Sequence, residues 1–142
     1  MKKRLDDIVR FIEDEVPFDK YLGIKVEALG EGFARLLISF RNEFIGDTRR
    51  PALHGGVISA LIDTCGGAAT WTLCTRADRI STVDMRVDYL RPGPNRDILA
   101  EATVQRMGNR VSVVHIRVFE AGDEETIIAE GRGVYNVRRA GA

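Results

Sequence analysis

The chain has 142 residues, of which 44% are hydrophobic and 30% are charged, the mixture expected of a globular protein. This length is typical of one domain, so we expect a single domain over residues 1–142. The 21 basic residues balance the 21 acidic ones, which leaves no overall charge to attract a nucleic acid or an anionic membrane. We therefore expect neither of these as a partner.

Three further features argue against a disulfide-bonded protein, a zinc protein and a secreted or membrane-anchored protein. Cys65 and Cys74 fall in one predicted helix, where they face different directions, and we expect them to remain free thiols. The two histidines, His54 and His115, have no cysteines paired near them in the spacing of a zinc site, so we expect no metal. Residues 1–7 turn acidic before any apolar stretch, which predicts neither a signal peptide nor a membrane anchor, and we expect a cytoplasmic protein.

The first part of the chain predicts a helix, a hairpin and a loop. Apolar residues recur three and four positions apart up to Val16, which precedes a proline, and this spacing predicts an amphipathic helix over residues 4–15. Alternating apolar residues on both sides of a glycine turn predict two antiparallel strands within residues 24–40. Residues 41–53 are rich in turn formers, so we expect a loop without helix or strand, and a loop of this length is commonly functional.

Residues 54–75 predict a buried central helix, because this stretch carries no basic residue and only one acid, Asp63. Gly66 and Gly67 within it each lower helix stability by about 1 kcal/mol relative to alanine. We therefore expect a backbone, a second helix or a ligand to approach the helix closely at these glycines.

Four strand-like segments separated by turns follow this helix. They cover residues 81–90, 98–106, 111–120 and 126–137. Two strands, a buried helix and four strands in series exclude a doubly wound parallel sheet. The sequence predicts an α+β fold in which a curved antiparallel sheet wraps around one long central helix.

Asp63 is the unusual residue of the central helix, because an unpaired buried carboxylate costs several kcal/mol. It could lie exposed at a rim, accept hydrogen bonds from Ser59 and Thr70, or be functional. His54 is predicted to cap the start of the helix. Gly55, directly after it, offers a backbone N–H group at the positive end of the helix dipole, which suits an anion or a developing oxyanion.

Arginines outnumber lysines in this chain, and many of them fall in predicted turns or at strand ends. Guanidinium groups bind phosphates through paired hydrogen bonds, which would suit a nucleotide-bearing ligand such as coenzyme A. The same arginines could equally be ordinary solvated turn residues.

Two motifs carry a resemblance to a known family: HGG at residues 54–56 followed by the acid at position 63, and YLRP at residues 89–92 at the end of the next strand. Together they closely resemble the hotdog-fold acyl-CoA thioesterases, in particular the phenylacetate-pathway-type branch of the 4-hydroxybenzoyl-CoA thioesterase superfamily. The resemblance covers residues 22–137. It implies a hotdog fold and the hydrolysis of an acyl-CoA substrate to a carboxylic acid and free coenzyme A, without a metal or an organic cofactor.

The resemblance implies roles for individual residues. Asp63 matches the catalytic carboxylate, which acts as general base on water or as nucleophile. The backbone N–H of Gly55, next to the motif residue His54, matches the donor to the thioester carbonyl oxygen. Thr82 matches a hydroxyl residue that helps to orient the attacking water. Asp47 stands where the family usually has Asn or Gln, which puts an acceptor in the place of a donor.

The family also implies a basic rim for the phosphates of coenzyme A. The turn residues nearest to the predicted catalytic strands are Arg91, Arg106 and Arg110. The acyl group is not fixed by any motif. Candidates for lining its pocket are Phe44, Trp71, Leu90 and Val137.

In this family the residues matching Gly55 and Asp63 of one site come from different subunits, so the resemblance implies a homodimer, and commonly a dimer of dimers. The strand at residues 81–90 could pair with its twin to join two sheets. Two alternatives stay open. One is a hotdog hydratase or dehydratase that uses His54 together with Asp63, and the other is a non-catalytic acyl-CoA-binding protein of the same fold.

Overall fold

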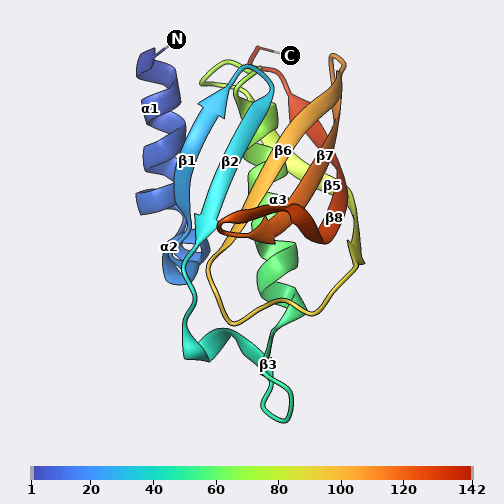
Figure 1. Cartoon of the computed structure of the whole chain (residues 1–142). Coiled ribbons are helices and arrows are strands. Elements are labelled where there is room, and N and C mark those ends of the chain that lie inside the picture. The colour runs from blue at the N-terminus through green and yellow to red at the C-terminus, as the bar shows by residue number, and fades with distance from the viewer. Residues whose placement is uncertain (1, 142) are drawn as a thin grey trace.

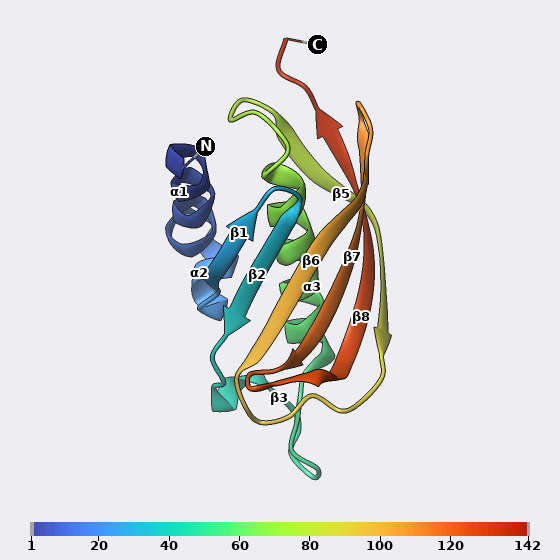
Figure 2. The same ribbon diagram turned by 45° about the horizontal axis from the view of Figure 1, so that its top comes forward.

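The computed structural model describes residues 2–141, in which a curved sheet encloses one long helix (Figures 1 and 2). The helical segments are α1 (Lys2–Arg10), the π-helical turn η1 (Phe11–Glu15), α2 (Pro17–Leu22), the 3-10 turn η2 (Asn42–Phe44) and α3 (Gly55–Trp71). The strands are β1 (Lys25–Gly30), β2 (Phe33–Ile38), β3 (Ile45–Asp47), β4 (Ala52–Leu53), β5 (Arg79–Tyr89), β6 (Ile98–Met107), β7 (Val111–Glu120) and β8 (Asp123–Arg138). Within residues 2–141, no helix is long and apolar enough to cross a membrane.

Six strands form one antiparallel sheet in the order β1-β2-β6-β7-β8-β5, and β3 pairs with β4 apart from it. The sheet curves around α3, which contacts β2, β5, β6, β7 and β8 (Figure 2). β5 follows α3 in the chain and lies at an edge of the sheet, beside β8. The predicted α+β fold, with an antiparallel sheet around one central helix, is confirmed.

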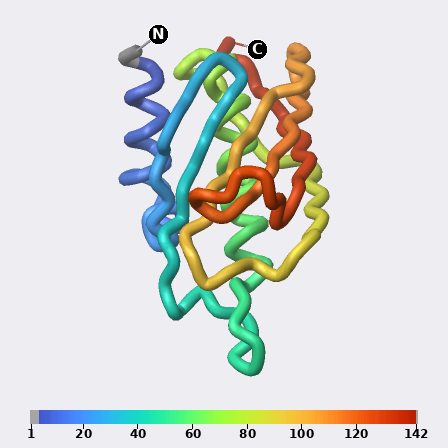
Figure 3. Tube along the Cα trace, viewed as in Figure 1, coloured from blue at the N-terminus to red at the C-terminus, as the bar shows by residue number. Residues whose placement is uncertain are grey.

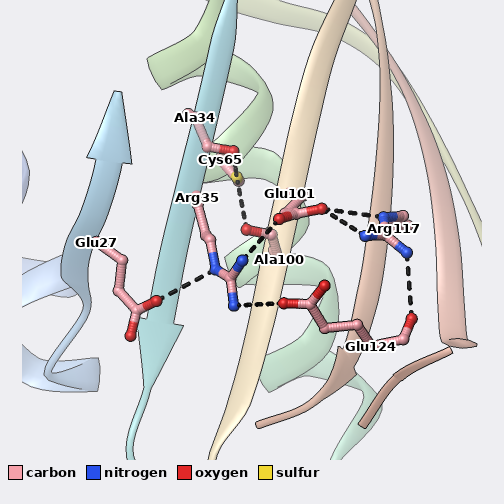
Figure 4. Close-up of polar contacts among 8 residues, drawn as sticks. All are labelled: Glu27, Ala34, Arg35, Cys65, Ala100, Glu101, Arg117 and Glu124. Atoms are coloured by element: carbon pink, nitrogen blue, oxygen red, sulfur yellow. Dashed lines mark hydrogen bonds and ion pairs between the residues drawn. The ribbon is translucent and has the colours of Figure 1, made fainter. Parts of the chain in front are cut away.

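The side of α3 that faces the sheet forms the centre of the core. Leu61, Ile62 and Cys65 on this side are fully buried. The thiol of Cys65 donates to the carbonyl oxygens of Ala34 at 3.5 Å and Ala100 at 3.4 Å, on β2 and β6 (Figure 4). Burial raises the pKa of this thiol well above its ordinary value, so the sulfur stays protonated and unreactive. Both cysteines are free and buried, as predicted.

The outer side of the sheet carries an ion-pair network across β1, β2, β6, β7 and the start of β8 (Figure 4). Arg35 lies within 3.2 Å of Glu27, 3.0 Å of Glu101 and 2.9 Å of Glu124. Arg117 binds the other oxygen of Glu101 at 2.6 Å. Because neighbouring strands supply opposite charges, the network favours the observed strand register and leaves this face polar.

The amino-terminal segment differs from the helix predicted at residues 4–15. The α-helix ends at Arg10, and η1 continues it as a wider turn in which the N–H of Val16 reaches the carbonyl oxygen of Phe11 at 3.0 Å. The helix α2 was not predicted from the sequence. Its signals were present: Pro17 occupies the first helical turn, and Gly23 ends the helix in a left-handed conformation with φ of 72°.

The prediction that residues 41–53 contain no helix or strand is wrong. This segment is held by contacts with distant parts of the chain, which the local sequence does not encode. The N–H of His54 donates to the carbonyl oxygen of Phe44 at 2.8 Å, and the N–H of Leu53 donates to the carbonyl oxygen of Gly93 at 3.0 Å. Gly46 permits this packing, because a Cβ there would lie 2.7 Å from the Cα of His54. The tip between β3 and β4 projects from the body of the molecule beside the start of α3 (Figure 3).

The central helix is shorter than the predicted 54–75, since it begins at Gly55 and ends at Trp71. At its end, the Thr72 hydroxyl donates to the carbonyl oxygen of Ala69 at 2.6 Å and accepts from the N–H of Gly32 at 2.8 Å. These bonds turn the chain away from the helical path towards β5. The four predicted strands after the helix are confirmed, with ends that differ by at most three residues from β5, β6, β7 and β8.

Candidate functional site

Asp63 and Thr82 meet where the middle of α3 faces the start of β5. The Thr82 hydroxyl donates to Oδ1 of Asp63 at 2.7 Å, and the Asp63 side chain is half-buried. The predicted alternative, in which Ser59 and Thr70 satisfy this carboxylate, is wrong. Ser59 bonds a backbone carbonyl of its own helix, and Thr70 lies 2.9 Å from the hydroxyl of Ser112 in the core. Asp63 therefore keeps its second oxygen, Oδ2, for another partner.

Tyr135 on β8 fixes the backbone of Asp63. Its hydroxyl donates to the Asp63 carbonyl oxygen at 2.9 Å, and the residue is only 1% exposed. Burial, with the nearby Asp63 charge as a smaller cause, raises the pKa of this phenol, so it remains a protonated donor. The ring lies against Gly66 of α3 and Gly133 of β8, where any Cβ would collide with it. The helix is closely approached at Gly66, as expected, but the approaching group is this side-chain ring and not the predicted backbone, second helix or ligand.

A cavity of about 680 Å³ opens beside Asp63 and Thr82. Its floor is the side of α3 that faces away from the sheet, one wall is the amino-terminal segment, and the other is the start of β5. Most of its surface is apolar. The residues lining it are Phe11, Ile12, Val16, Phe18, Asp19, Ala60, Asp63, Thr64, Gly67, Ala68, Trp71, Asp78, Arg79, Ile80, Ser81, Thr82 and Tyr135.

Asp19 is a further carboxylate in this cavity, and it was not predicted because it belongs to the unpredicted helix α2. It is 7% exposed and accepts a hydrogen bond from the hydroxyl of Thr64 at 3.2 Å. Burial raises its pKa above the ordinary 3.8, the Thr64 bond lowers it in part, and the charge of Asp63 raises it further. Three acids thus border one largely apolar cavity: Asp63 is half-buried, and Asp19 and Asp78 are buried, with Asp78 paired to Arg139 at 3.3 Å.

The Asp19→Asn variant is expected to unfold at a higher temperature than the wild type at pH 7. The raised pKa means that the folded state binds the proton more tightly, so the charged form of Asp19 destabilises the fold as pH rises. Asparagine removes this charge and can still accept from Thr64. The gain should disappear below pH 3.8, where the acid is protonated in both states. The unfolding temperatures of the wild type and Asp19→Asn, measured from below pH 3.8 to pH 7, test this expectation. The exposed Asp14→Asn is the control. An Asp19→Asn protein less stable than the wild type at pH 7 would show that burial does not disfavour the charged form of Asp19.

The start of α3 has the geometry predicted for it. Nδ1 of His54 accepts from the N–H of Gly56 at 2.8 Å, which confirms the predicted cap. Gly55 is the first helical residue, so its own N–H faces no carbonyl of the helix. Tyr89 covers this glycine: its hydroxyl donates to the Gly55 carbonyl oxygen at 3.1 Å, and a Cβ on Gly55 would lie 3.2 Å from its ring.

The two parts of the predicted site do not meet within one chain. Gly55 and Asp63 are eight residues apart on one straight helix, which separates them by about 12 Å. His54 is further still from Asp63, so a histidine–carboxylate pair is not formed in a single subunit either. The fold brings Asp63 and Thr82 together, but it leaves Gly55 and His54 apart from them at the start of α3.

Asp47 lies at the end of β3, in the projecting loop. Its Oδ1 accepts from the N–H of Arg49 at 2.9 Å and from that residue's Nε at 3.2 Å. These hydrogen bonds, the backbone one first, hold the pKa of Asp47 below 3.8. The residue therefore stays a charged acceptor bound to its own loop.

The three predicted phosphate-binding arginines divide between opposite ends of β5. Arg91 lies two residues beyond the end of β5 and binds the carbonyl oxygen of Ile127, whereas Arg110 lies beside Val137, which pairs with the start of β5. Arg106 is near the same end as Arg110, on β6. The eleven residues of β5 span roughly 35 Å, so the three do not form one rim within a subunit.

Of the four residues predicted to line an acyl pocket, only Trp71 borders the cavity. Phe44 and Val137 are buried in the core, and Leu90 is exposed beyond the end of β5. Within residues 2–141, no three His, Cys, Asp or Glu side chains gather in a way that could hold a metal ion.

The chain is similar to a known protein family. The family model described as thioesterase superfamily matches residues 51–127, more than half of the chain. The chain belongs to the thioesterase superfamily. The medium/long-chain acyl-CoA thioesterase YigI of Escherichia coli (strain K12) is 32% identical to this superfamily member over 135 residues, covering 86% of each protein. A putative esterase of Halobacterium salinarum is 34% identical over 144 residues, covering 94% of this chain and 95% of its own.

Solved structures agree with the superfamily assignment. A protein from Shewanella oneidensis, described as related to the thioesterase superfamily, superposes with a TM-score of 0.81 at 29% identity and covers 95% of each chain. The predicted hotdog fold and the predicted class of hydrolase are thereby confirmed for this thioesterase-superfamily chain. The narrower phenylacetate-pathway-type branch stays a prediction.

Proposed function

We propose that this protein hydrolyses the thioester bond of an acyl-CoA, with Asp63 as the catalytic carboxylate and with a site completed by a second copy of the chain. The observation that carries the proposal is Asp63 itself: a half-buried carboxylate at an apolar cavity, oriented through one oxygen by Thr82. Membership of the thioesterase superfamily and the similarity to an acyl-CoA thioesterase support it.

In this proposal Asp63 acts as general base. Oδ2 takes a proton from a water molecule, and the water oxygen forms a bond to the thioester carbon. The tetrahedral intermediate then breaks its carbon–sulfur bond. The proton held by Asp63 passes to the leaving sulfur, so that one carboxylic acid and one molecule of free coenzyme A are formed. Thr82 keeps the carboxylate aimed, and Tyr135 keeps the helix backbone beneath it in place.

The oxyanion of this intermediate needs a donor, and the N–H of Gly55 suits it because it is unpaired within the helix and lies at the positive end of the helix dipole. About 12 Å of helix separate it from Asp63 of the same chain. The donor in this proposal therefore comes from the partner in a homodimer. β5 supports such an assembly, because it is a long edge strand whose outer side is unpaired, with Val83 on it 64% exposed.

Two other functions for the same fold predict different products. A hydratase would use His54 as base, but the Nδ1 of this residue is occupied by the N–H of Gly56. A non-catalytic acyl-CoA-binding protein would leave its ligand intact. Incubation with saturated and 2-enoyl-CoA esters, followed by free-thiol detection, separates the three. We expect thiol from the saturated esters; a hydrated enoyl ester without thiol, or intact ligand, would overturn the proposal.

Thr82→Val is expected to lower kcat by about tenfold, since a hydrogen bond to a charged group contributes at least about 1.5 kcal/mol. Valine keeps the shape of the side chain and removes only the hydroxyl. Thr82→Ser restores the hydroxyl and should retain most of the activity. Steady-state kinetics on one acyl-CoA measures both variants. Equal kcat values for the wild type and Thr82→Val would remove Thr82 from the site.

Replacing Arg91, Arg106 or Arg110 by alanine is expected to raise KM for an acyl-CoA several-fold with little change in kcat. Phosphates lie far from the reacting carbonyl and are bound equally in the ground and transition states. Antiparallel pairing of two β5 strands would carry Arg91 of one subunit to the end where the other subunit has Arg110. The control substrate is the N-acetylcysteamine thioester, which lacks phosphates. An equal loss of activity on that analogue would show that these arginines are structural.

A further inference from the structure

The floor of the cavity runs from Asp63 along α3 to an aromatic pair. Asp63, Gly67 and Trp71 are four residues apart, so they lie in one row on the helix. Gly67 leaves this floor open midway, since it has no side chain. At the end of the row, Trp71 meets Phe11 with ring centroids 4.8 Å apart and an interplanar angle of 79°.

Apolar side chains line both sides of this row. Ile12 and Val16 from the amino-terminal segment form one side, and Ile80 of β5 forms the other. Phe11 is 41% exposed although it borders the cavity, so much of its ring is left for a further apolar group to cover. Arg4 of α1 binds the carbonyl oxygen of Trp71 and so ties the amino-terminal segment to the end of α3. An alkyl chain starting at Asp63 would therefore run between apolar walls and stop at two rings.

We infer that the Phe11–Trp71 pair is the end stop of an acyl channel, and that the amino-terminal segment thereby selects thioesters of unbranched acyl chains about as long as octanoyl or decanoyl. This inference rests on the proposed function. Asp63 and Trp71 are eight residues apart, which is about 12 Å along the helix. An extended chain of carbon–carbon bonds advances roughly 1.3 Å per carbon, so this length holds about nine carbons.

Two substitutions move the stop in opposite directions. Phe11→Ala removes one ring and lengthens the channel, so the substrate with the highest kcat/KM should become longer than decanoyl-CoA. Gly67→Val fills the floor about 6 Å from Asp63, so the preferred substrate should become hexanoyl-CoA or shorter. A Cβ on Gly67 would lie 3.8 Å from the Tyr135 ring, an ordinary contact, so the first carbon of the new side chain fits against this ring.

The experiment measures kcat/KM from acetyl-CoA to palmitoyl-CoA for the wild type and both variants. The ratio of palmitoyl-CoA to octanoyl-CoA activity should rise at least about tenfold in Phe11→Ala, and the ratio of octanoyl-CoA to butanoyl-CoA activity should fall by a similar factor in Gly67→Val, the scale on which an apolar pocket discriminates chain length. The control is Tyr21→Ala, which removes an exposed aromatic ring of the same segment that does not line the cavity. Its profile should match that of the wild type.

The outcomes separate this inference from the proposed function. A wild type that releases no thiol from any ester overturns both. A wild type that is active, with an unchanged profile in both variants, overturns the inference alone. A change in dimerisation of Phe11→Ala without a change of profile also overturns it, because the ring would then serve the subunit interface. If Phe11→Ala does not fold, Gly67→Val decides the question by itself.

Discussion

Asp63→Asn is expected to lower kcat by at least about 100-fold, the usual loss on removal of a general base. Asparagine has nearly the same shape and can still accept the hydrogen bond from Thr82, so the site keeps its geometry and loses only its base. Asp63→Ala should be at least as impaired. Steady-state thiol release on an acyl-CoA substrate measures both variants.

The loss must be one of chemistry and not of folding. Asp63 is half-buried in an apolar cavity beside a second acid, so removing its charge should not lower the unfolding temperature. Asp123→Asn is the control, because Asp123 is an exposed acid at the start of β8 that lies outside both the cavity and β5. It should keep wild-type kcat. A folded Asp63→Ala protein with near-normal activity would refute the assignment of the catalytic carboxylate.

Gly66→Ala is expected to lower the free energy of unfolding by about 2 kcal/mol, whereas Gly67→Ala should raise it by up to about 1 kcal/mol. The two glycines are neighbours on α3 but meet different surroundings. A Cβ on Gly66 would collide with the hydroxyl of Tyr135, which is buried and cannot move aside, while a Cβ on Gly67 would make an ordinary contact at 3.8 Å. Thermal or denaturant unfolding measures the difference.

A double variant identifies the cause of this loss. Gly66→Ala combined with Tyr135→Phe removes the atom that the new Cβ would strike, so part of the lost stability should return relative to Tyr135→Phe alone. If Gly66→Ala and Gly67→Ala have equal stabilities, the close contact between α3 and Tyr135 is not formed in solution. The position of Asp63 on the helix would then lack the support described here.

The periodic parts of the fold were predictable from the sequence, because their signals are local. The uncharged stretch with one acid marks α3, and alternating residues between glycine and asparagine turns mark β6 and β7. The segments that were missed are ordered by distant partners. The loop around Gly46 is held by the backbone of His54, and the widened turn η1 places Glu13 where it accepts from the N–H of Val26 at 2.8 Å.

The residues of the site also divide into those with a local sequence signal and those defined by distant contacts. Asp63 was conspicuous because a lone acid stands out in an apolar helix, and the resemblance to a family paired it with Thr82. Asp19 and Tyr135 were not predictable, since each is defined by a contact across the fold: Asp19 with Thr64, and Tyr135 with the backbone of Asp63. No local pattern distinguishes them from other acids and tyrosines. Arg91 was grouped with Arg106 and Arg110 in one predicted phosphate-binding rim. Within a subunit, however, the length of β5 separates Arg91 from the other two.

Hydrolysis of octanoyl-CoA in water enriched in oxygen-18 tests the central claim most directly. If Asp63 activates water against the thioester, the wild type should produce one free thiol for each molecule of octanoic acid, and each acid should carry oxygen from the solvent. Asp63→Asn should form neither product at a comparable rate. Intact octanoyl-CoA after incubation with the wild type, or thiol and labelled acid formed equally fast by Asp63→Asn, would contradict the account.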